Sequence, residues 1–251
     1  MAKRLQVQIW SDIACPWCYV GKRRFESALQ QFAHGDEVEV TWRSFELDPR
    51  APRVRPHQDY AERLAAKYGR TRGQAQEMID RMVEMALADG IEMNFDHIQP
   101  GNTFDAHRLL HLAHRAGGSS KQDALEERFF RAYLVEGRSI GDPDALRGLA
   151  TDVGLPEDEV SAVLATDQYA REVRADEDEA HALGIHGVPF FVLANRYAIE
   201  GAQPAELMLS ALERAWSEVP AALHIVKSGA DSVADGAVCG PDGCEVPSDS
   251  R

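Results

Sequence analysis

Apolar and polar residues alternate in the first segment of the chain and again in three later segments. Residues 5–11 place Leu5, Val7 and Ile9 on one side, and residues 38–45 repeat this pattern. The strand signal returns at residues 188–193 and 197–200, which a short polar turn joins. A period of two residues is typical of half-buried β-strands. The pattern therefore predicts two strands near the beginning of the chain and two more after residue 187.

Between these pairs of strands, apolar residues recur at the three- and four-residue spacing of helices. The patterns cover residues 77–88, 104–116, 124–135, 144–153 and 157–183, with breaks at positions such as Gly90 and Gly117-Gly118. Glycine and proline breaks of this kind favour five to seven helices between residues 58 and 182. A further helix is predicted to start at Pro16, where the missing N–H of proline costs nothing, and a last one covers residues 204–216.

The order of these elements predicts an α/β fold in two halves. Residues 1–56 and 184–216 form the two halves, and residues 57–183 form a helical insertion between them. Beyond residue 216 the apolar density falls, and residues 228–236 have the small polar composition of a flexible linker. We therefore expect residues 217–251 to be a flexible tail, although it contains a pair of cysteines, Cys239 and Cys244.

Composition and charge restrict the possible partners. The chain has 251 residues, 44% hydrophobic and 27% charged, as in an average soluble globular protein. Its 41 acidic and 27 basic residues give a net charge of −14, which repels phosphate, so neither nucleic acid nor a membrane surface is an expected partner. No apolar stretch approaches the roughly 20 residues of a membrane span. Residues 1–10 alternate like a strand rather than a signal peptide, so a cytoplasmic location is expected.

Candidate chemistry is concentrated where the first strand meets the first helix, at Cys15-Pro16-Trp17-Cys18. A cysteine reacts as the thiolate, and the positive end of a helix stabilises that charge. Cys15 is therefore the expected nucleophile and the more exposed thiol. Cys18, one helical turn further, is placed to resolve a mixed disulfide. In a cytosolic protein this arrangement is typical of a thioredoxin-like redox motif that needs no bound cofactor, only an external thiol reductant or oxidant.

Zinc binding is the alternative interpretation of this motif. Cys239 and Cys244 would then supply the other two ligands. The position of the motif between a strand and an apolar-faced helix, with proline between the cysteines, argues against this interpretation, and we expect no metal.

Other polar residues leave alternatives open. His107, His111 and His114 share one helical face; the first two have a spacing that suits a metal, but all three can equally line a groove or face solvent. Asp12 is either a proton relay or a turn residue, and His186 either tunes the charge of Cys15 or is a solvated loop residue. The acidic run at residues 176–179 is expected to form a solvated helix face.

The chain resembles the DsbA-like thioredoxin-fold family in its order of strand, CPWC motif, helix, strand, helical insertion, Gly187-Val188-Pro189, hairpin and helix. The resemblance covers about residues 3 to 216. Three segments look like the FrnE branch: Ser11-Asp12 with the following CPWCY, FELDP at residues 45–49, and NTFDAHR at residues 102–108. The implied structure is a thioredoxin-like fold with a large all-helical insertion and a C-terminal extension.

The resemblance also implies a substrate-binding region. Val188–Pro189 would be a cis peptide that faces the motif, beside the backbone that pairs with an extended substrate. Pro16 and Trp17 would contact the substrate, and Asn102, Thr103 and His107 would border the cleft. Relatives typically have a histidine between the cysteines, so Trp17 implies a weaker oxidant.

The expected activity is that of a thiol–disulfide oxidoreductase or isomerase for protein substrates, with glutathione or a thioredoxin-type protein as a further partner. The same branch is similar to hydroxychromene-carboxylate isomerases and kappa-class glutathione transferases, which makes a glutathione-dependent isomerase or transferase of small aromatic molecules the alternative. Those enzymes generally have serine at the position of Cys15, so the two cysteines favour redox chemistry. A zinc-held or peptide-binding module without turnover is a third hypothesis.

Cys239 and Cys244 are predicted to form a second redox pair that exchanges with the first. The intervening Pro241-Asp242-Gly243 favours a turn that brings the two sulfurs together. Residues 227–238 have a random-coil span of about 19 Å, and a compact fold of this size has a radius of gyration near 18 Å, roughly the same distance. The competing interpretation is a purely local disulfide.

Overall fold

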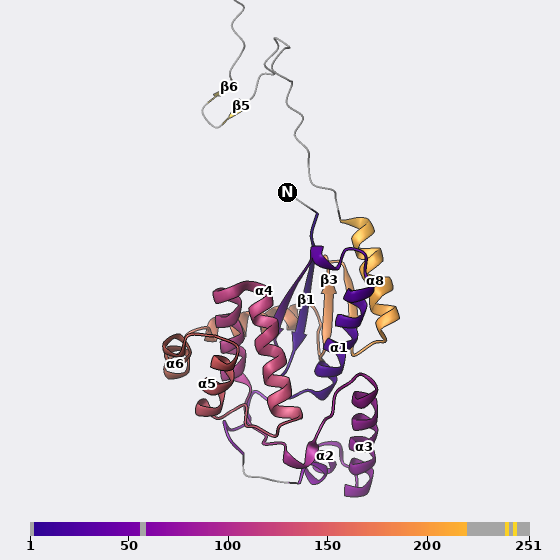
Figure 1. Cartoon of the computed structure of the whole chain (residues 1–251), viewed down its shortest axis with the longest axis vertical. Helices are drawn as coiled ribbons and strands as arrows, with labels where there is room; N and C mark the ends of the chain where they lie inside the picture. Colours follow the sequence, from indigo (N-terminus) through magenta and orange to yellow (C-terminus); the bar gives the residue numbers. More distant parts are fainter. Residues whose placement is uncertain (1–2, 56–58, 220–238, 241–242, 245–251) are drawn as a thin grey trace, which may run out of the picture. The chain divides into compact units, whose positions relative to one another are not determined.

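A four-stranded sheet forms the centre of the fold. The computed structural model describes residues 3–55, 59–219, 239–240 and 243–244. Within them, β1 (Leu5–Ser11), β2 (Val38–Ser44), β3 (Phe190–Leu193) and β4 (Tyr197–Glu200) lie in the order β2-β1-β3-β4. β1 is parallel to β2 and antiparallel to β3, and β3 is antiparallel to β4 (Figure 1). All four predicted strands are present.

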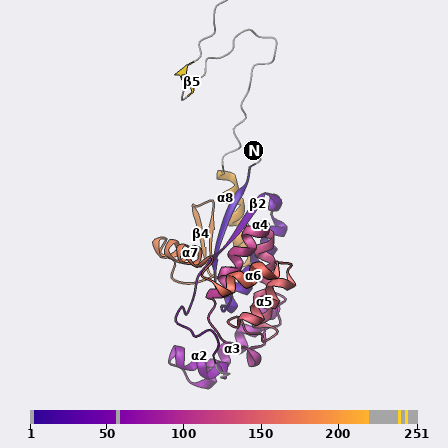
Figure 2. The same ribbon diagram turned by 90° about the vertical axis from the view of Figure 1, so that its left-hand side faces the viewer.

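Helices cover both faces of this sheet. On one face, α1 (Pro16–Gln31) and α8 (Ala205–Glu218) pack together against the side of β1 that carries Leu5, Val7 and Ile9. On the other face, Trp10 contacts the end of α7 (Ala170–Ala182). The alternation of β1 therefore places apolar residues in two cores, one on each side of the sheet (Figures 1 and 2).

The predicted helical insertion lies between β2 and β3. Its helices in the described residues are α2 (Tyr60–Tyr68), α3 (Arg72–Ala88), α4 (Phe104–Leu134), α5 (Pro143–Asp152), α6 (Glu157–Ala165) and α7. The two helices predicted around residue 117 run on as α4, but the backbone is non-helical at Gly117 and at Gly118, which has φ +67° and ψ −161°. Only glycine adopts such angles readily, so the predicted break lies at the correct residues.

The single helix predicted at residues 157–183 is wrong. Two helices, α6 and α7, occupy this segment, and Tyr169 between them has a left-handed backbone with φ +64°. The buried Arg108 of α4 holds the connection, because its guanidinium donates to the carbonyl oxygens of residues 163, 166 and 168. The residue that holds this connection is 55 to 60 positions away along the chain, so the local periodicity cannot show it.

The acidic run on α7 is also less solvated than predicted. Asp176 is only 2% exposed. Its carboxylate accepts from Arg43 at 2.8 Å and from the Ser44 backbone N–H at 3.0 Å, and it lies 3.1 Å from His111 Nε2. Burial alone would raise the pKa of Asp176, but the hydrogen bonds of His111 and Ser44 and the charges of His111 and Arg43 lower it. Asp176 therefore anchors α7 to β2.

The chain divides into two compact units. Residues 4–219 form one, and residues 1–3 with 220–251 form the other. In the second unit, β5 (Cys239–Gly240) and β6 (Gly243–Cys244) are antiparallel, with Cys239 opposite Cys244. The linker at 227–238, on which the predicted relay depends, lies outside the described residues.

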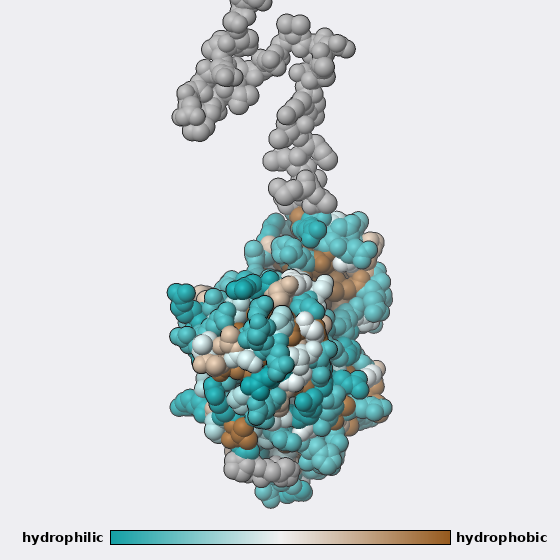
Figure 3. Space-filling view, turned by 60° about the vertical axis from the view of Figure 1, so that its left-hand side comes forward, coloured by the Kyte–Doolittle hydropathy of each residue, from teal (hydrophilic) through white to brown (hydrophobic). Residues whose placement is uncertain are grey.

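No helix in the described part of the chain has both the length and the apolar character that crossing a bilayer requires. In the view of Figure 3, hydrophilic residues cover most of the visible face, and hydrophobic ones form small separate groups.

Candidate active site at the start of helix α1

Cys15 lies between β1 and α1, directly before the first helical residue. It is the N-cap of α1, with extended backbone angles, and Pro16 occupies the first helical position. The first turn, all of which is described, carries no acidic residue, and no side chain caps it. The positive end of the helix therefore faces Cys15 without a competing carboxylate in that turn, which favours a negative charge at this sulfur.

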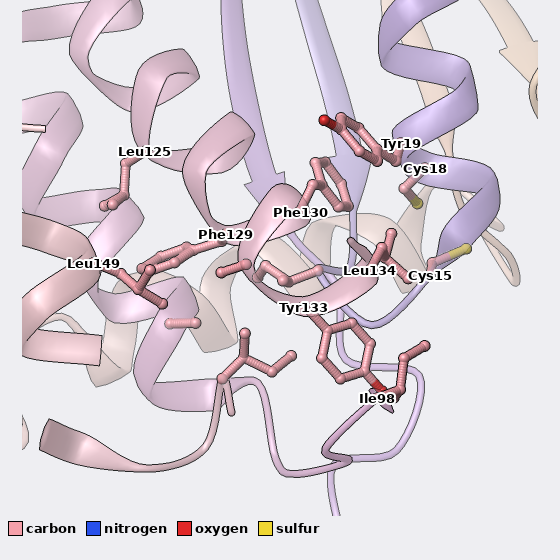
Figure 4. Packing of buried hydrophobic residues seen from close by; sticks show 14 of the residues in the cluster. Cys15, Cys18, Tyr19, Ile98, Leu125, Phe129, Phe130, Tyr133, Leu134 and Leu149 are labelled. Atoms are coloured by element: carbon pink, nitrogen blue, oxygen red, sulfur yellow. The ribbon is translucent and has the colours of Figure 1, made fainter. Parts of the chain in front are cut away.

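The two cysteines have different surroundings. Both are free thiols, and Cys15 is 6% exposed whereas Cys18 is fully buried, so Cys15 is the more exposed of the pair, as predicted. Burial raises the pKa of the Cys18 thiol well above its ordinary value, and a hydrogen bond with Cys15 raises it further. Figure 4 shows Cys18 near Tyr19 and Phe130, whose stacked rings have centroids 5.0 Å apart.

The segment before β3 faces the motif. The Val188–Pro189 peptide is cis, as the resemblance implied. The Cys15 thiol donates to the Val188 carbonyl oxygen at an Sγ–O distance of 3.6 Å. Gly21 of α1 allows this approach, because a Cβ there would lie 2.8 Å from a ring carbon of Pro189. The structure thus brings together Cys15, Val188 and Pro189.

A pocket of about 780 Å³ opens beside Cys15. Cys15, Pro16 and Trp17 form one part of its lining, and α2 and α3 form another. Nine large hydrophobic side chains are exposed in the described residues, and five of these line the pocket: Trp17, Leu47, Tyr68, Met78 and Met85. A concentration of exposed apolar side chains at one place is typical of a binding site.

Basic side chains also line this pocket. They are Arg55, Arg63, Lys67 and Arg81, against the acidic Asp12 and Asp48. Arg55 pairs with Asp48, but Arg63 forms no ion pair within the described residues, and its buried Nη1 has no hydrogen-bond partner there. Arg63 is therefore available to an anionic group of a bound molecule.

Two residues that the resemblance placed at the cleft do not line the pocket. His107 is 1% exposed and does not line the pocket, so its predicted position at a groove is wrong. Asn102 donates to Glu46 Oε1 at 3.0 Å and is also absent from the lining. Thr103 does line it. Asp12 lines the pocket and accepts from the backbone N–H of Ala14 and Leu47, which is the bonding of a turn residue.

His111 and His186 have separate surroundings. His111 pairs with Asp176, away from His107, and His186 is exposed. No group of three or more histidine, cysteine or acidic side chains among the described residues has the arrangement of a metal site.

A buried polar pair behind the motif has no signal in the sequence. The Ser11 hydroxyl donates to Glu126 Oε1 at 2.9 Å, and Glu126 is fully buried. Burial raises the pKa of Glu126 to about 7, although the charge of His107, the hydrogen bond of Ser11 and the charge of Lys22 lower it. The two residues are 115 positions apart, and only the packing of α4 behind β1 brings them together.

Comparison with known proteins identifies relatives along most of the chain. Residues 6–213 match the DSBA-like thioredoxin domain family. The uncharacterized protein YwbO of Bacillus subtilis is 31% identical over 197 residues, which cover 76% of this chain and 88% of YwbO.

Similar folds occur among solved structures. A probable DsbA oxidoreductase from Streptomyces coelicolor is 47% identical, with a TM-score of 0.82, over 98% of this chain and all of that one. Two further structures share the fold alone. A 2-hydroxychromene-2-carboxylate isomerase is 14% identical, with a TM-score of 0.59 over 83% of this chain and 95% of that one. The cytosolic disulfide reductase DsbM of Pseudomonas aeruginosa is 15% identical, with a TM-score of 0.55 over 84% of this chain and 95% of that one. The expected thioredoxin-like fold with its helical insertion is confirmed.

Proposed function

Because the chain belongs to the DsbA-like thioredoxin domain family, we propose that it is a thiol–disulfide oxidoreductase or isomerase that acts on disulfides of polypeptides through Cys15 and Cys18. The observation that carries this proposal is the position of Cys15, a free thiol at a helix N-terminus and on the wall of a pocket rich in exposed apolar side chains. The probable DsbA oxidoreductase of Streptomyces coelicolor, 47% identical, supports the same reaction class.

The composition of the pocket favours polypeptide substrates of varied sequence. Met78, Met82 and Met85 of α3 line it. Methionine side chains are flexible and polarizable, so such a surface can repack around different partners. The carbonyl of Val188, beside Cys15, can accept a hydrogen bond from the backbone of an extended segment next to the reacting disulfide.

The proposed reaction has two exchange steps. The Cys15 thiolate attacks one sulfur of the substrate disulfide, forming a bond to that sulfur while the other sulfur leaves as a thiolate. Cys18 then attacks Cys15, forming the Cys15–Cys18 disulfide and releasing the second substrate sulfur. The substrate gains two electrons and two protons, and the cysteine pair loses them. An external thiol reverses the change in the enzyme, and we propose that Cys239 and Cys244 take part in this exchange.

Reduction of insulin by dithiothreitol tests the proposal. The full chain should accelerate precipitation of the insulin B chain, and Cys15→Ser should reduce the rate to that of dithiothreitol alone. A Cys15→Ser variant that keeps the wild-type rate would exclude Cys15 as the nucleophile and overturn the assignment.

A glutathione-dependent reaction is the second candidate function, and Arg63, which forms no ion pair within the described residues, favours it. Glutathione carries two carboxylates besides its thiol, and Arg63 can pair with one of them in the pocket. A second structure of DsbM, which aligns with this chain at 17% identity and shares the fold alone, was solved with glutathione. Turnover of a hydroxychromene carboxylate with glutathione, lost in Arg63→Gln, would establish this function; no turnover would exclude this substrate.

A further inference from the structure

The pocket beside Cys15 has a charge opposite in sign to that of the whole chain. The chain has a net charge of −14, whereas four basic and two acidic side chains line the pocket and give it a charge of +2. Complementary charge selects among binding partners, because like charges brought together are unfavourable. The pocket therefore suits an anionic group, although the chain as a whole repels one.

Two of these four basic side chains have no acidic partner. Arg55 pairs with Asp48, and Arg81 lies 3.6 Å from an acidic side chain of its own helix. Arg63 and Lys67 form no ion pair within the described residues. The buried Nη1 of Arg63 also lacks a hydrogen-bond partner there. Because buried donors are rarely left unpaired, we expect a bound molecule to supply the acceptor.

One face of α2 presents both of these basic side chains to the pocket. Four of the α2 residues that line it recur at intervals of three and four positions, the spacing of one helical face: Tyr60, Arg63, Leu64 and Lys67. The three methionines of α3 line the same pocket and form an adaptable apolar surface. A polypeptide segment that carries an acidic residue among apolar ones complements both parts of this lining.

Two tyrosine hydroxyl groups belong to the same pocket as Arg63. Burial raises the pKa of Tyr60 to about 12 and also raises that of Tyr133, while the charge of Arg63 lowers both. A negative charge at Cys15 raises the pKa of Tyr60 further. Both hydroxyls therefore keep their protons at neutral pH and can donate hydrogen bonds to a carboxylate.

We propose that Arg63, together with Lys67 one helical turn further along α2, binds the carboxylate of an acidic residue near the reacting cysteine of the substrate polypeptide. This inference deepens the proposed function and rests on it. A guanidinium can donate two parallel hydrogen bonds to one carboxylate, and the exposed Lys67 adds a second positive charge. Arg63 thus determines which segments bind beside Cys15, and it takes no part in the exchange of sulfur bonds.

Glutathione also carries carboxylates, but it matches the apolar part of the pocket less well. Five exposed apolar side chains line the pocket, among them Trp17 and Met85. Glutathione has no bulky apolar side chain, so it would leave these side chains in contact with water. A longer segment covers them and gains the free energy of apolar burial, which favours a polypeptide as the source of the carboxylate.

Two matched peptides test this preference. Each peptide forms a disulfide with thionitrobenzoate, has leucine after its cysteine, and has either glutamate or glutamine before it. Attack by Cys15 on the peptide sulfur releases the coloured aromatic thiolate. The reduced full chain carries Cys239→Ser and Cys244→Ser, so that only the first pair reacts. The release rate is measured against peptide concentration and divided by the rate of the same peptide with dithiothreitol, which removes differences in intrinsic reactivity.

The background protein should react with the glutamate peptide about tenfold faster than with the glutamine peptide at low concentration. This ratio is near the lower end of what a hydrogen bond to a charged group contributes. In Arg63→Gln the ratio should fall below about twofold, through weaker binding rather than a lower limiting rate. Arg63→Lys keeps the charge and should retain part of the preference. Because the ratio is taken within one protein, a loss of total activity does not affect it.

Arg70→Gln is the matched control, because Arg70 is exposed just beyond the end of α2 and does not line the pocket. It removes the same charge and should keep the tenfold ratio. A preference that falls equally in Arg70→Gln would reflect the overall charge of the chain and would overturn the proposal.

Other results would also overturn the proposal. Equal rates for the two peptides in the background protein, or a preference that survives in Arg63→Gln, would exclude the subsite and leave the proposed function in place. An effect of Arg63→Gln confined to glutathione disulfide would assign the site to glutathione instead. Absence of thiolate release from both peptides would contradict the reactivity of Cys15 and thus the proposed function itself.

Discussion

Cys15 and Cys18 are three residues apart, but their sulfur atoms have different surroundings. Cys15 is 6% exposed, occupies the N-cap position of α1 and lines the pocket, whereas Cys18 is fully buried against the core. The pKa of Cys18 is raised well above its ordinary value, chiefly by burial. Two thiols one helical turn apart thus differ in accessibility, which suits their proposed roles as nucleophile and resolving thiol.

Alkylation should distinguish the two thiols. In the reduced chain at pH 7, iodoacetamide should modify Cys15 at least about tenfold faster than Cys18, because only the thiolate reacts and Cys18 is both buried and held as the thiol. Peptide mapping after timed quenching measures both rates. The Cys18→Ser variant should keep the rate at Cys15; preferential modification of Cys18 would contradict the assignment.

At the scale of elements, the short helix α2 and its neighbour α3 form the pocket wall opposite the motif. α2 has nine residues and only one of them, Ala61, is buried. Tyr60 and Leu64 are half-buried: they pack against the core and also line the pocket. The helix has only nine residues, fewer than the roughly 11 to 18 over which a helical period is recognised, so the sequence pattern did not predict its bounds.

Local sequence patterns predict only those parts of the fold that depend on neighbouring residues. β1, β4 and the start of α1 depend on local alternation and on Pro16, and they occur where the pattern placed them. Asp176, Glu126 and Gln122 depend on partners far along the chain. Gln122 of α4, for example, bonds both the N–H and the C=O of Trp42 on the edge strand β2. Such pairings leave no periodic signal, because only the assembled fold creates them.

The anchoring of α7 to β2 can be tested at Asp176. Asp176→Asn should lower the free energy of unfolding by about 1.5–3 kcal/mol at pH 7, the usual contribution of hydrogen bonds to a charged group. The pKa of Asp176 is lower in the folded state, so its carboxylate stabilises the fold above about pH 4, the unfolded value, and this contribution disappears as pH falls through the folded value.

Urea denaturation at pH 7 and pH 3 measures this effect. The difference between variant and wild type should shrink at the lower pH. Asp178→Asn on the exposed side of α7 serves as the matched control and should change the unfolding free energy by less than about 0.5 kcal/mol. An equal loss at both pH values would contradict the charged anchor.

At the scale of the whole molecule, the second cysteine pair belongs to a unit distinct from the fold that carries Cys15. Cys239 and Cys244 lie opposite each other in the β5–β6 pair. We predict that Cys239→Ser with Cys244→Ser slows catalytic turnover by about threefold or more, because the exchange between the two pairs is lost. Turnover with a glutathione-based reductant measures this; an unchanged rate and an unchanged redox state at Cys15–Cys18 would reject the relay.

The central claim is that Cys15 forms a covalent intermediate with a disulfide substrate and that Cys18 resolves it. The most direct measurement is the intact mass of the full chain carrying Cys18→Ser, Cys239→Ser and Cys244→Ser after incubation with a disulfide-linked peptide. The account predicts one peptide adduct, mapped to Cys15 and removed by dithiothreitol, and no such adduct when Cys18 is restored and completes the exchange. Absence of the adduct from the Cys18→Ser protein would contradict the account.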